Sequence, residues 1–217
     1  MHLKLVRLTA ALMLATGLSA CAPLLLGGAV GGAFVMTDRR TSGAQLEDQG
    51  IEIKAERRVR EALGDKVHVN VRAYNRVVLL TGEVPSDLER QAVEKWAAST
   101  ENVQSVINEL AVMGATSLTA RSSDVIVANK VRFTFVDAKD LQSNAFKVVV
   151  ERGEVFLMGM VTEREAHRAA ELASTVSGVV KVVKVLHIIS EAELAAKLPP
   201  PSPASAASEV SASSFAR

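Results

Sequence analysis

Few side chains of this chain could do chemistry, and their spacing supports little of it. Glu163 and Glu165 have the residue type for acid–base work, but they stand in the first turn of a predicted helix, where capping and the helix dipole explain them. The histidines beyond the first few residues are scattered, and none lies at metal-ligand spacing: His68, His167 and His187. The sequence has no phosphate-binding loop and no Ser-His-Asp order. We therefore predict no enzyme, no metal site and no cofactor.

The single cysteine is the exception. Cys21 follows a basic start, an apolar stretch over residues 8–18 and the small residues Ser19 and Ala20, which is the order of a secretory signal. This arrangement resembles a bacterial lipobox, in which the thiol is diacylated, the chain is cut before the cysteine and the new amino group is acylated. An ordinary signal followed by an unmodified cysteine is the alternative. We predict lipidation of Cys21 because the spacing, the small residues and the lone cysteine agree. Two or more acyl chains would then anchor the protein stably, at about 0.8 kcal/mol per buried methylene.

The residues after Cys21 predict where in the cell envelope the protein is located. In enterobacterial lipoproteins, an aspartate directly after the lipidated cysteine is typical of proteins retained in the inner membrane. This chain has Ala22 at that position, so we predict that it lies in the outer membrane and faces the periplasm. Residues 22–36 are apolar but shorter than the roughly 20 residues that span a bilayer. Residues 37–50 are polar and are interpreted as a tether. A net charge of +1 with export predicts no nucleic-acid partner.

Two glycine-centred apolar segments divide the folded part into two copies of one unit. Residues 77–84 contain Gly82, residues 154–161 contain Gly159, and a valine follows two residues after each glycine. A charged, alanine-bearing helical pattern comes after both segments. We interpret the two glycines as permitting a bulge or the close approach of a helix.

The periodicity predicts the same elements in each copy. The first copy has a helix over 51–63, a strand around 66–72, a turn at Tyr74-Asn75-Arg76, a strand over 77–84, a helix opened by Ser86 and Glu89, and a strand over 103–112. Leu88, Ala92 and Trp96 are predicted to line the buried face of that second helix. The second copy has a helix over 124–135, strands over 146–151 and 155–161, a capping-box helix from Thr162, and a strand over 179–189. Asn102 and Gly178 are predicted to end the second helices in left-handed conformation.

Each copy is therefore α-β-β-α-β, and the fold class is α+β. The helix between the second and third strands is a right-handed crossover, so each small sheet is mixed and packs both helices on one face. The predicted organisation is a signal peptide at 1–20, a lipidated N-terminus and tether at 21–50, the first unit at 51–112, a linker at 113–122, the second unit at 123–190 and a disordered Pro/Ser/Ala-rich tail at 191–217.

The repeated motif behind a lipobox resembles the BON domain, and the pair resembles the dual-BON outer-membrane lipoproteins associated with division and outer-membrane stress. The residues that carry the resemblance are 153–166 and 176–179 in the second copy and 80–84 and 103–106 in the first. The resemblance covers residues 18–190. It implies a non-enzymatic, periplasm-facing lipoprotein that binds anionic phospholipid and supports envelope integrity.

The two first helices differ on the face away from the core. Aligning Ala55 with Val127 places charged residues of the first helix (54, 57, 58 and 61) opposite Ile126, Asn129, Lys130 and Phe133 of the second. Apolar side chains beside a cation suit the interfacial zone of an anionic membrane. The predicted lipid-binding residues are Val125, Ile126, Asn129, Lys130 and Phe133.

Two alternatives stay open for this face. Ile126 and Phe133 could pack against the first unit or the linker. The same residues could instead dock a protein of the envelope or cell-wall assembly machinery, which would make the chain an adaptor.

Overall fold

The computed structural model describes residues 38–64 and 67–197. From Arg39 onward, these residues belong to one compact unit. The predicted signal peptide, Cys21 and the residues after Lys197 lie outside the described part. Within that part, no helix combines the length and hydropathy needed to cross a bilayer.

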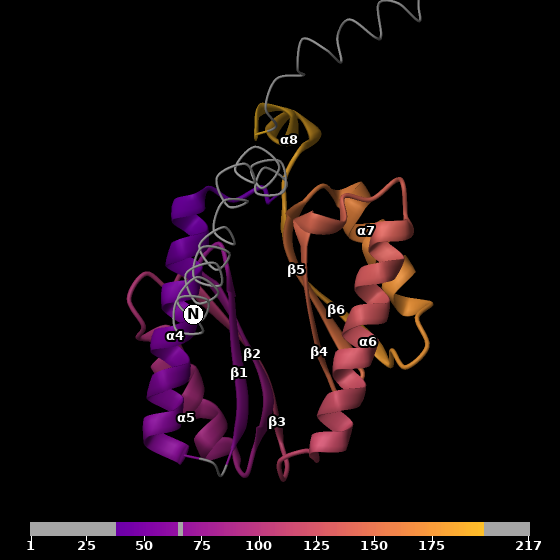
Figure 1. The fold of residues 1–217 in the computed structure, drawn as a ribbon. Helices are drawn as coiled ribbons and strands as arrows, with labels where there is room; N and C mark the ends of the chain where they lie inside the picture. The colour runs from indigo at the N-terminus through magenta and orange to yellow at the C-terminus, as the bar shows by residue number, and fades with distance from the viewer. Residues whose placement is uncertain (1–37, 65–66, 198–217) are drawn as a thin grey trace, which may run out of the picture. The chain divides into compact units, whose positions relative to one another are not determined.

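Both copies have the predicted element order (Figure 1). The first domain contains, in order, α4 (Ser42–Leu63), β1 (His68–Tyr74), β2 (Val77–Val84), α5 (Asp87–Ala98) and β3 (Ser105–Val112). The second contains α6 (Leu118–Asp137), the 3-10 turn η3 (Ser143–Ala145), β4 (Phe146–Glu151), β5 (Glu154–Val161), α7 (Glu163–Ser174) and β6 (Lys181–Ile188), followed by α8 (Glu191–Lys197). In each sheet the central strand pairs antiparallel with its hairpin partner and parallel with the strand after the crossover helix. The α+β class and the mixed sheets are confirmed.

Three boundaries differ from the prediction by enough to change the predicted domain organisation. The helix α4 begins at Ser42, capped by the Thr41 hydroxyl 3.2 Å from the Ala44 amide, so residues 42–50 are helical and not a tether. The helix α6 begins at Leu118 behind the cap Ser117, which shortens the predicted linker. The predicted tail begins with a helix, α8, over Glu191–Lys197.

Successive residues of each central strand point to opposite faces of its sheet, so alternate residues pack into different apolar clusters. Val78 and Leu80 of β2 pack under α4 and α5. Val155 and Leu157 of β5 pack under α6 and α7. Each domain therefore has its own apolar core between one sheet face and two helices, and Figure 1 shows the helices on the outer side of each sheet.

The opposite faces of the two sheets pack against each other. Leu79 of β2 and Phe156 and Met158 of β5 are fully buried in this third cluster. The other buried members are Tyr74, Met160, Val185, Ile189 and Leu194. Full burial of a large apolar side chain stabilises by roughly 1.5–3 kcal/mol, so this contact ties the two domains together.

Gly82 and Gly159 are needed because the backbone at the start of the neighbouring strand leaves no room for a side chain. A bulge or a nearby helix, as predicted, is not the reason. A Cβ on Gly82 would lie 2.0 Å from the His68 carbonyl oxygen, and one on Gly159 would lie 2.3 Å from the Ala145 carbonyl oxygen. In both sheets the blocking atom belongs to the start of the antiparallel partner strand or the residue before it. The repeated glycine therefore marks a place where the partner strand leaves no room for a side chain.

The second helices show both corrections and agreements. Leu88 of α5 is 76% exposed, and Val93 and Ala97 are the residues that it buries. The Ser86 hydroxyl accepts from the Leu88 amide and donates to the Glu89 carboxylate, so the reciprocal capping box is absent there. The capping box of α7 is present at Thr162 and Glu165. Residues 102 and 178 have the predicted left-handed conformation, with φ of 68° and 99°. They do not end the helices, because α5 ends at Ala98 and α7 at Ser174, each followed by a C-cap residue in right-handed conformation.

Candidate functional site

The outer face of α6 carries a line of exposed apolar side chains, which we call the apolar ridge. Its members are Leu118, Val125, Ile126, Phe133 and Val136, with exposed fractions from 57% for Ile126 to 78% for Leu118. The opposite side of the helix buries Val127, Val131 and Phe135 in the core. Ile126 and Phe133 are exposed and belong to none of the clusters of packed apolar residues in the described part of the chain, so the structure does not support the alternative that they pack against the first domain.

Basic side chains flank the apolar ridge on both sides. At 100° per residue, Asn129 falls within the ridge, Lys130 falls on one flank, and Arg121 and Arg132 fall on the other. The predicted residues thus share one exposed face. The prediction missed Leu118, Arg121 and Val136 because it placed the helix at 124–135; extending the helical period in both directions would have found them. Arg132 lies inside the predicted helix and was missed because the predicted face stopped at the apolar residues around Lys130.

A pair of aspartates sets the correct register between the two first helices. The Asp48 carboxylate accepts from the amides of Asn75 and Arg76, at 2.7 and 2.8 Å. The Asp124 carboxylate accepts from the amides of Arg152 and Gly153, both at 2.9 Å. Each aspartate therefore holds the β-hairpin turn of its own domain. Matching these two residues shows that the alignment used in the sequence analysis is wrong by one helical turn.

In the corrected register the contrast between the two helices remains. The positions of α4 that correspond to Val125, Ile126, Asn129, Lys130, Phe133 and Val136 are Gln49, Gly50, Ile53, Lys54, Arg57 and Arg60. Only Ile53 among them is a large apolar residue. The apolar ridge therefore belongs to the second domain alone, while the lysine occurs in both.

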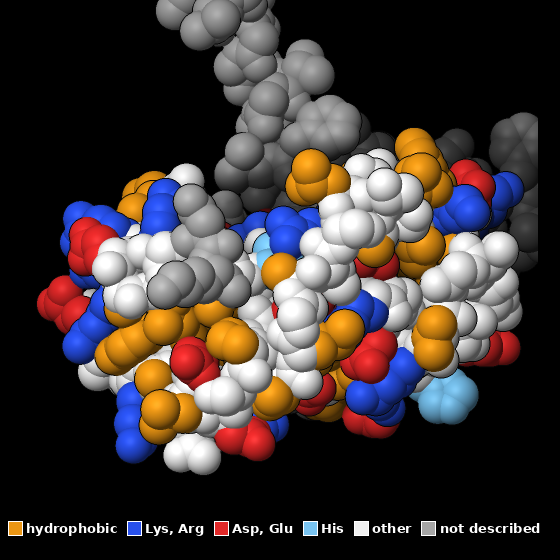
Figure 2. Space-filling view, turned by 90° about the horizontal axis from the view of Figure 1, so that it is seen from below, with side chains coloured by type: hydrophobic (Ala, Val, Ile, Leu, Met, Phe, Trp, Pro, Cys, Tyr) orange, Lys and Arg blue, Asp and Glu red, His pale blue; other side chains and the backbone are white. Residues whose placement is uncertain are grey.

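A hollow of about 310 Å³ lies beside the apolar ridge, between the two domains. Its walls come from β1, α6 and β4, and its lining residues are His68, Asn70, Arg72, Arg121, Asp124, Val125, Ala128, Arg132, Val148, Val149, Val150 and Glu151. On the face of the protein shown in Figure 2, apolar, basic and acidic side chains are intermixed. Any selectivity of this face for a ligand must therefore come from the local arrangement of its side chains and not from the overall charge of the protein.

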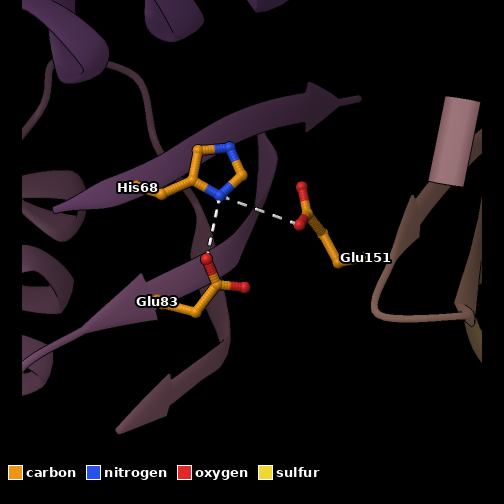
Figure 3. Close-up of side chains that lie close together, drawn as sticks. All are labelled: His68, Glu83 and Glu151. Atoms are coloured by element: carbon orange, nitrogen blue, oxygen red, sulfur yellow. Dashed lines mark hydrogen bonds and ion pairs between the residues drawn. The ribbon is translucent and has the colours of Figure 1, made fainter. Parts of the chain in front are cut away.

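At one end of the hollow, His68 meets two carboxylates (Figure 3). His68 Nδ1 lies 3.1 Å from Glu83 Oε2 and 3.9 Å from Glu151 Oε2. Asn70 Nδ2 donates to the other oxygen of Glu151 at 2.5 Å. Glu151 belongs to the second domain and the other three residues to the first, so the cluster crosses the domain boundary.

The two carboxylates of this cluster have opposite pKa shifts. Burial raises the pKa of Glu151, and the neighbouring His68 opposes that effect only in part. Burial also acts to raise the pKa of Glu83, but hydrogen bonds from Thr116, Arg152 and His68 outweigh it and leave that pKa below its usual value. Glu83 is therefore held as a carboxylate, whereas Glu151 binds a proton more readily.

The possible ligand atoms of His68, Glu83 and Glu151 lie within 4.8 Å of one another, which is close enough for a cation site. Both oxygens of Glu83 already accept hydrogen bonds, from Thr116 and from Arg152 Nη1 at 2.8 Å. A cation there would face the Arg152 guanidinium at short range. These contacts fit a hydrogen-bonded junction between the domains better than a metal centre.

The two arginines before α4 are also fixed, each to a different domain. Arg39 binds both carboxylate oxygens of Glu165 at 2.7 Å and the Met160 carbonyl oxygen at 2.9 Å, and this ion pair is almost fully buried. Arg40 binds Asp48 at 2.7 Å and places its guanidinium 4.1 Å from the centre of the Tyr74 ring. The chain thus enters the folded unit through a two-point attachment.

Comparison with known proteins agrees with this architecture. The BON domain model matches residues 53–114 and 123–190. The chain is 39% identical over 171 residues to the outer membrane lipoprotein DolP of Haemophilus influenzae, covering 77% of this chain and 88% of that protein. It is 30% identical over 154 residues to the 21 kDa hemolysin of Actinobacillus pleuropneumoniae, covering 70% and 79%. The chain therefore belongs to the BON-domain family, as an outer-membrane lipoprotein with two such domains.

A solved structure with detectable likeness is CdsD, a structural protein of the type III secretion system of Chlamydia trachomatis. It shares 11% identity and covers 66% of this chain and 95% of its own, with a TM-score of 0.28. A likeness of this size does not bear on function.

Proposed function

We propose that this outer-membrane lipoprotein binds anionic phospholipid through the apolar ridge of α6 and thereby supports the integrity of the envelope. The observation that carries the proposal is the exposure of five large apolar side chains on one helix face, flanked by basic residues on both sides. A helix with this cross-section lies in the plane of a membrane interface, its apolar face among the acyl chains and its cations at the headgroups. The other copy of the same helix lacks the ridge.

The magnitudes indicate what each part of this face contributes. Burying one large apolar side chain is worth roughly 1.5–3 kcal/mol, and one basic side chain near an anionic surface is worth about 1 kcal/mol. The apolar ridge therefore supplies most of the binding energy, and Lys130, Arg121 and Arg132 supply the preference for anionic lipid. Acyl chains on Cys21 would add attachment, so the role of α6 would be to orient the domains on the membrane.

The test uses residues 37–217, which contain every described element and all the apolar cores. We expect this fragment to co-sediment with phosphatidylglycerol vesicles more strongly than with phosphatidylcholine vesicles of the same acyl chains. The variant Ile126→Glu, Phe133→Glu should lose about tenfold or more of this binding, because two carboxylates replace apolar contacts.

A matched control changes two apolar residues that are equally exposed elsewhere. Ile53→Glu, Leu88→Glu adds the same charge on α4 and α5, and it should keep most of the binding. If the fragment does not bind the vesicles, or if the ridge variant binds as well as the wild type, the lipid proposal is wrong. A protein-docking role for the ridge then becomes the better explanation.

A further inference from the structure

We infer that the hollow between the domains is the headgroup site of this lipoprotein and that its arginines bind the phosphate of an anionic phospholipid. The inference rests on the proposed lipid binding and adds the place and chemistry of headgroup recognition. It assigns a role to the first domain, which a membrane contact through α6 alone would not require.

Two guanidinium groups at the hollow, those of Arg121 and Arg132, form no ion pair with any carboxylate of the described residues. Arg121 donates from Nε to the Thr116 hydroxyl at 3.4 Å, and Arg132 donates to the Val148 carbonyl oxygen at 2.9 Å and to the Asn129 side chain at 3.2 Å. Within residues 38–64 and 67–197, neither has an acidic side chain at ion-pair distance. Guanidinium groups bind phosphate oxygens in pairs of parallel hydrogen bonds, so they match this ligand.

The acidic residues that line the same hollow are already occupied. Asp124 accepts from the two amides of its hairpin turn. Glu151 accepts from Asn70 and faces His68, and burial raises its pKa, which favours the neutral form of this side chain. A third arginine, Arg72 of β1, reaches the hollow from the first domain while bound to Glu56 at 2.9 Å. The basic side chains are therefore the groups left to meet a ligand.

The position of the hollow fits a lipid and not only a free anion. Val125 belongs both to the apolar ridge and to the lining of the hollow. An acyl chain lying along the ridge would therefore continue into a headgroup placed beside Arg121 and Arg132. A volume of about 310 Å³ is at the lower end of ligand pockets, which suits a small headgroup such as phosphoglycerol.

The experiment compares arginine variants of residues 37–217 on phosphatidylglycerol vesicles. We expect Arg121→Gln, Arg132→Gln to weaken binding by about tenfold or more, and Arg72→Gln alone to weaken it about threefold. The control Arg57→Gln, Arg60→Gln removes the same number of charges from the equivalent face of α4 and should change binding by less than about twofold. Equal thermal unfolding midpoints would show that all variants are folded.

The outcomes separate this inference from the proposed function. If the ridge variant loses binding while the hollow and control variants behave alike, the headgroup site is refuted and lipid binding through α6 stands. If the wild type does not bind the vesicles, the proposed function fails, and the headgroup site fails with it. Arginine Nε–H resonances that shift with inorganic phosphate at constant ionic strength, but not with phosphatidylglycerol bicelles, would refute the lipid source and leave a site for free anions.

Discussion

Glu83 and Met160 follow the repeated glycines, Gly82 and Gly159, at equivalent positions of the two central strands. Met160 joins the apolar contact between the sheets, whereas Glu83 is fully buried and binds Arg152 of the other domain. An unpaired buried carboxylate would cost several kcal/mol, so the partner arginine and the threonine at 116 are required by its burial. The junction between the domains thus depends on individual polar residues as well as on packing.

The three shifted buried carboxyls predict an unusual dependence of stability on pH. The pKa of Glu151 is raised by burial, so stability increases as pH falls toward the ordinary glutamate value of 4.5. The pKa values of Glu83 and Glu165 are lowered: burial opposes this, but hydrogen bonds outweigh it, chiefly from Thr116 and Arg39 respectively, so their contribution is lost as pH falls below 4.5. We expect the urea midpoint to rise from neutral pH toward a maximum just above 4.5 and then to fall.

The variant Glu151→Gln tests whether Glu151 causes the rise in stability between neutral pH and the maximum. It should remove the rise between neutral pH and the maximum and keep the fall at lower pH. Glu61→Gln, at a side chain that is 70% exposed, is the control and should leave the whole curve unchanged. A profile of Glu151→Gln that still rises as in the wild type would contradict the assignment.

At the level of elements, each first helix is fastened to the hairpin beneath it by one aspartate. Replacing Asp48 by Ala removes the acceptor of two turn amides and of Arg40, and we expect a loss of about 2–4 kcal/mol in the free energy of unfolding. Asp124→Ala should cost about 1–3 kcal/mol. Asp87→Ala, at an exposed helix start, should cost less than about 1 kcal/mol. Urea unfolding of residues 37–217 measures all three, and equal losses would argue against the fastening role.

The same aspartates explain where prediction from sequence succeeded and failed. The strand β2 was predicted at its observed bounds because its apolar run begins after the turn residues Asn75 and Arg76 and ends just before Pro85. The start of α4 was missed because the first buried residue of this helix is the acidic Asp48. A helix predicted from the spacing of apolar residues does not include a turn whose inward-facing side chain is charged. For the same reason the two helices were aligned one turn apart. The exposed face of α6 was predicted because exposure there follows from the helical period alone.

The hollow and the His68 cluster could not have been predicted in this way. Their walls come from β1 of one domain and from α6 and β4 of the other, and no local pattern indicates which edges of two separate sheets meet. The histidine itself was dismissed as scattered, since its partners are Glu83 in the next strand and Glu151 across the boundary.

For the whole molecule, the face-to-face contact of the sheets predicts coupled unfolding of the two domains. We expect calorimetry of residues 37–217 to show one transition. Leu79→Glu places a charge in the fully buried centre of that contact and should split the transition in two, since each domain keeps its own core. Leu88→Glu, at an exposed leucine of α5, should retain the single transition. Two transitions already in the wild type would show that the contact is too weak to couple the domains.

The two-point attachment at Arg39 and Arg40 has a mechanical consequence. Tension arriving along the chain from an N-terminal anchor meets Glu165 of the second domain and Asp48 of the first at neighbouring residues. Load is therefore shared between both domains at the point of entry, and neither has to be pulled open to transmit it to the other. A lipoprotein built in this way would move with its membrane as a rigid body when the envelope is stretched.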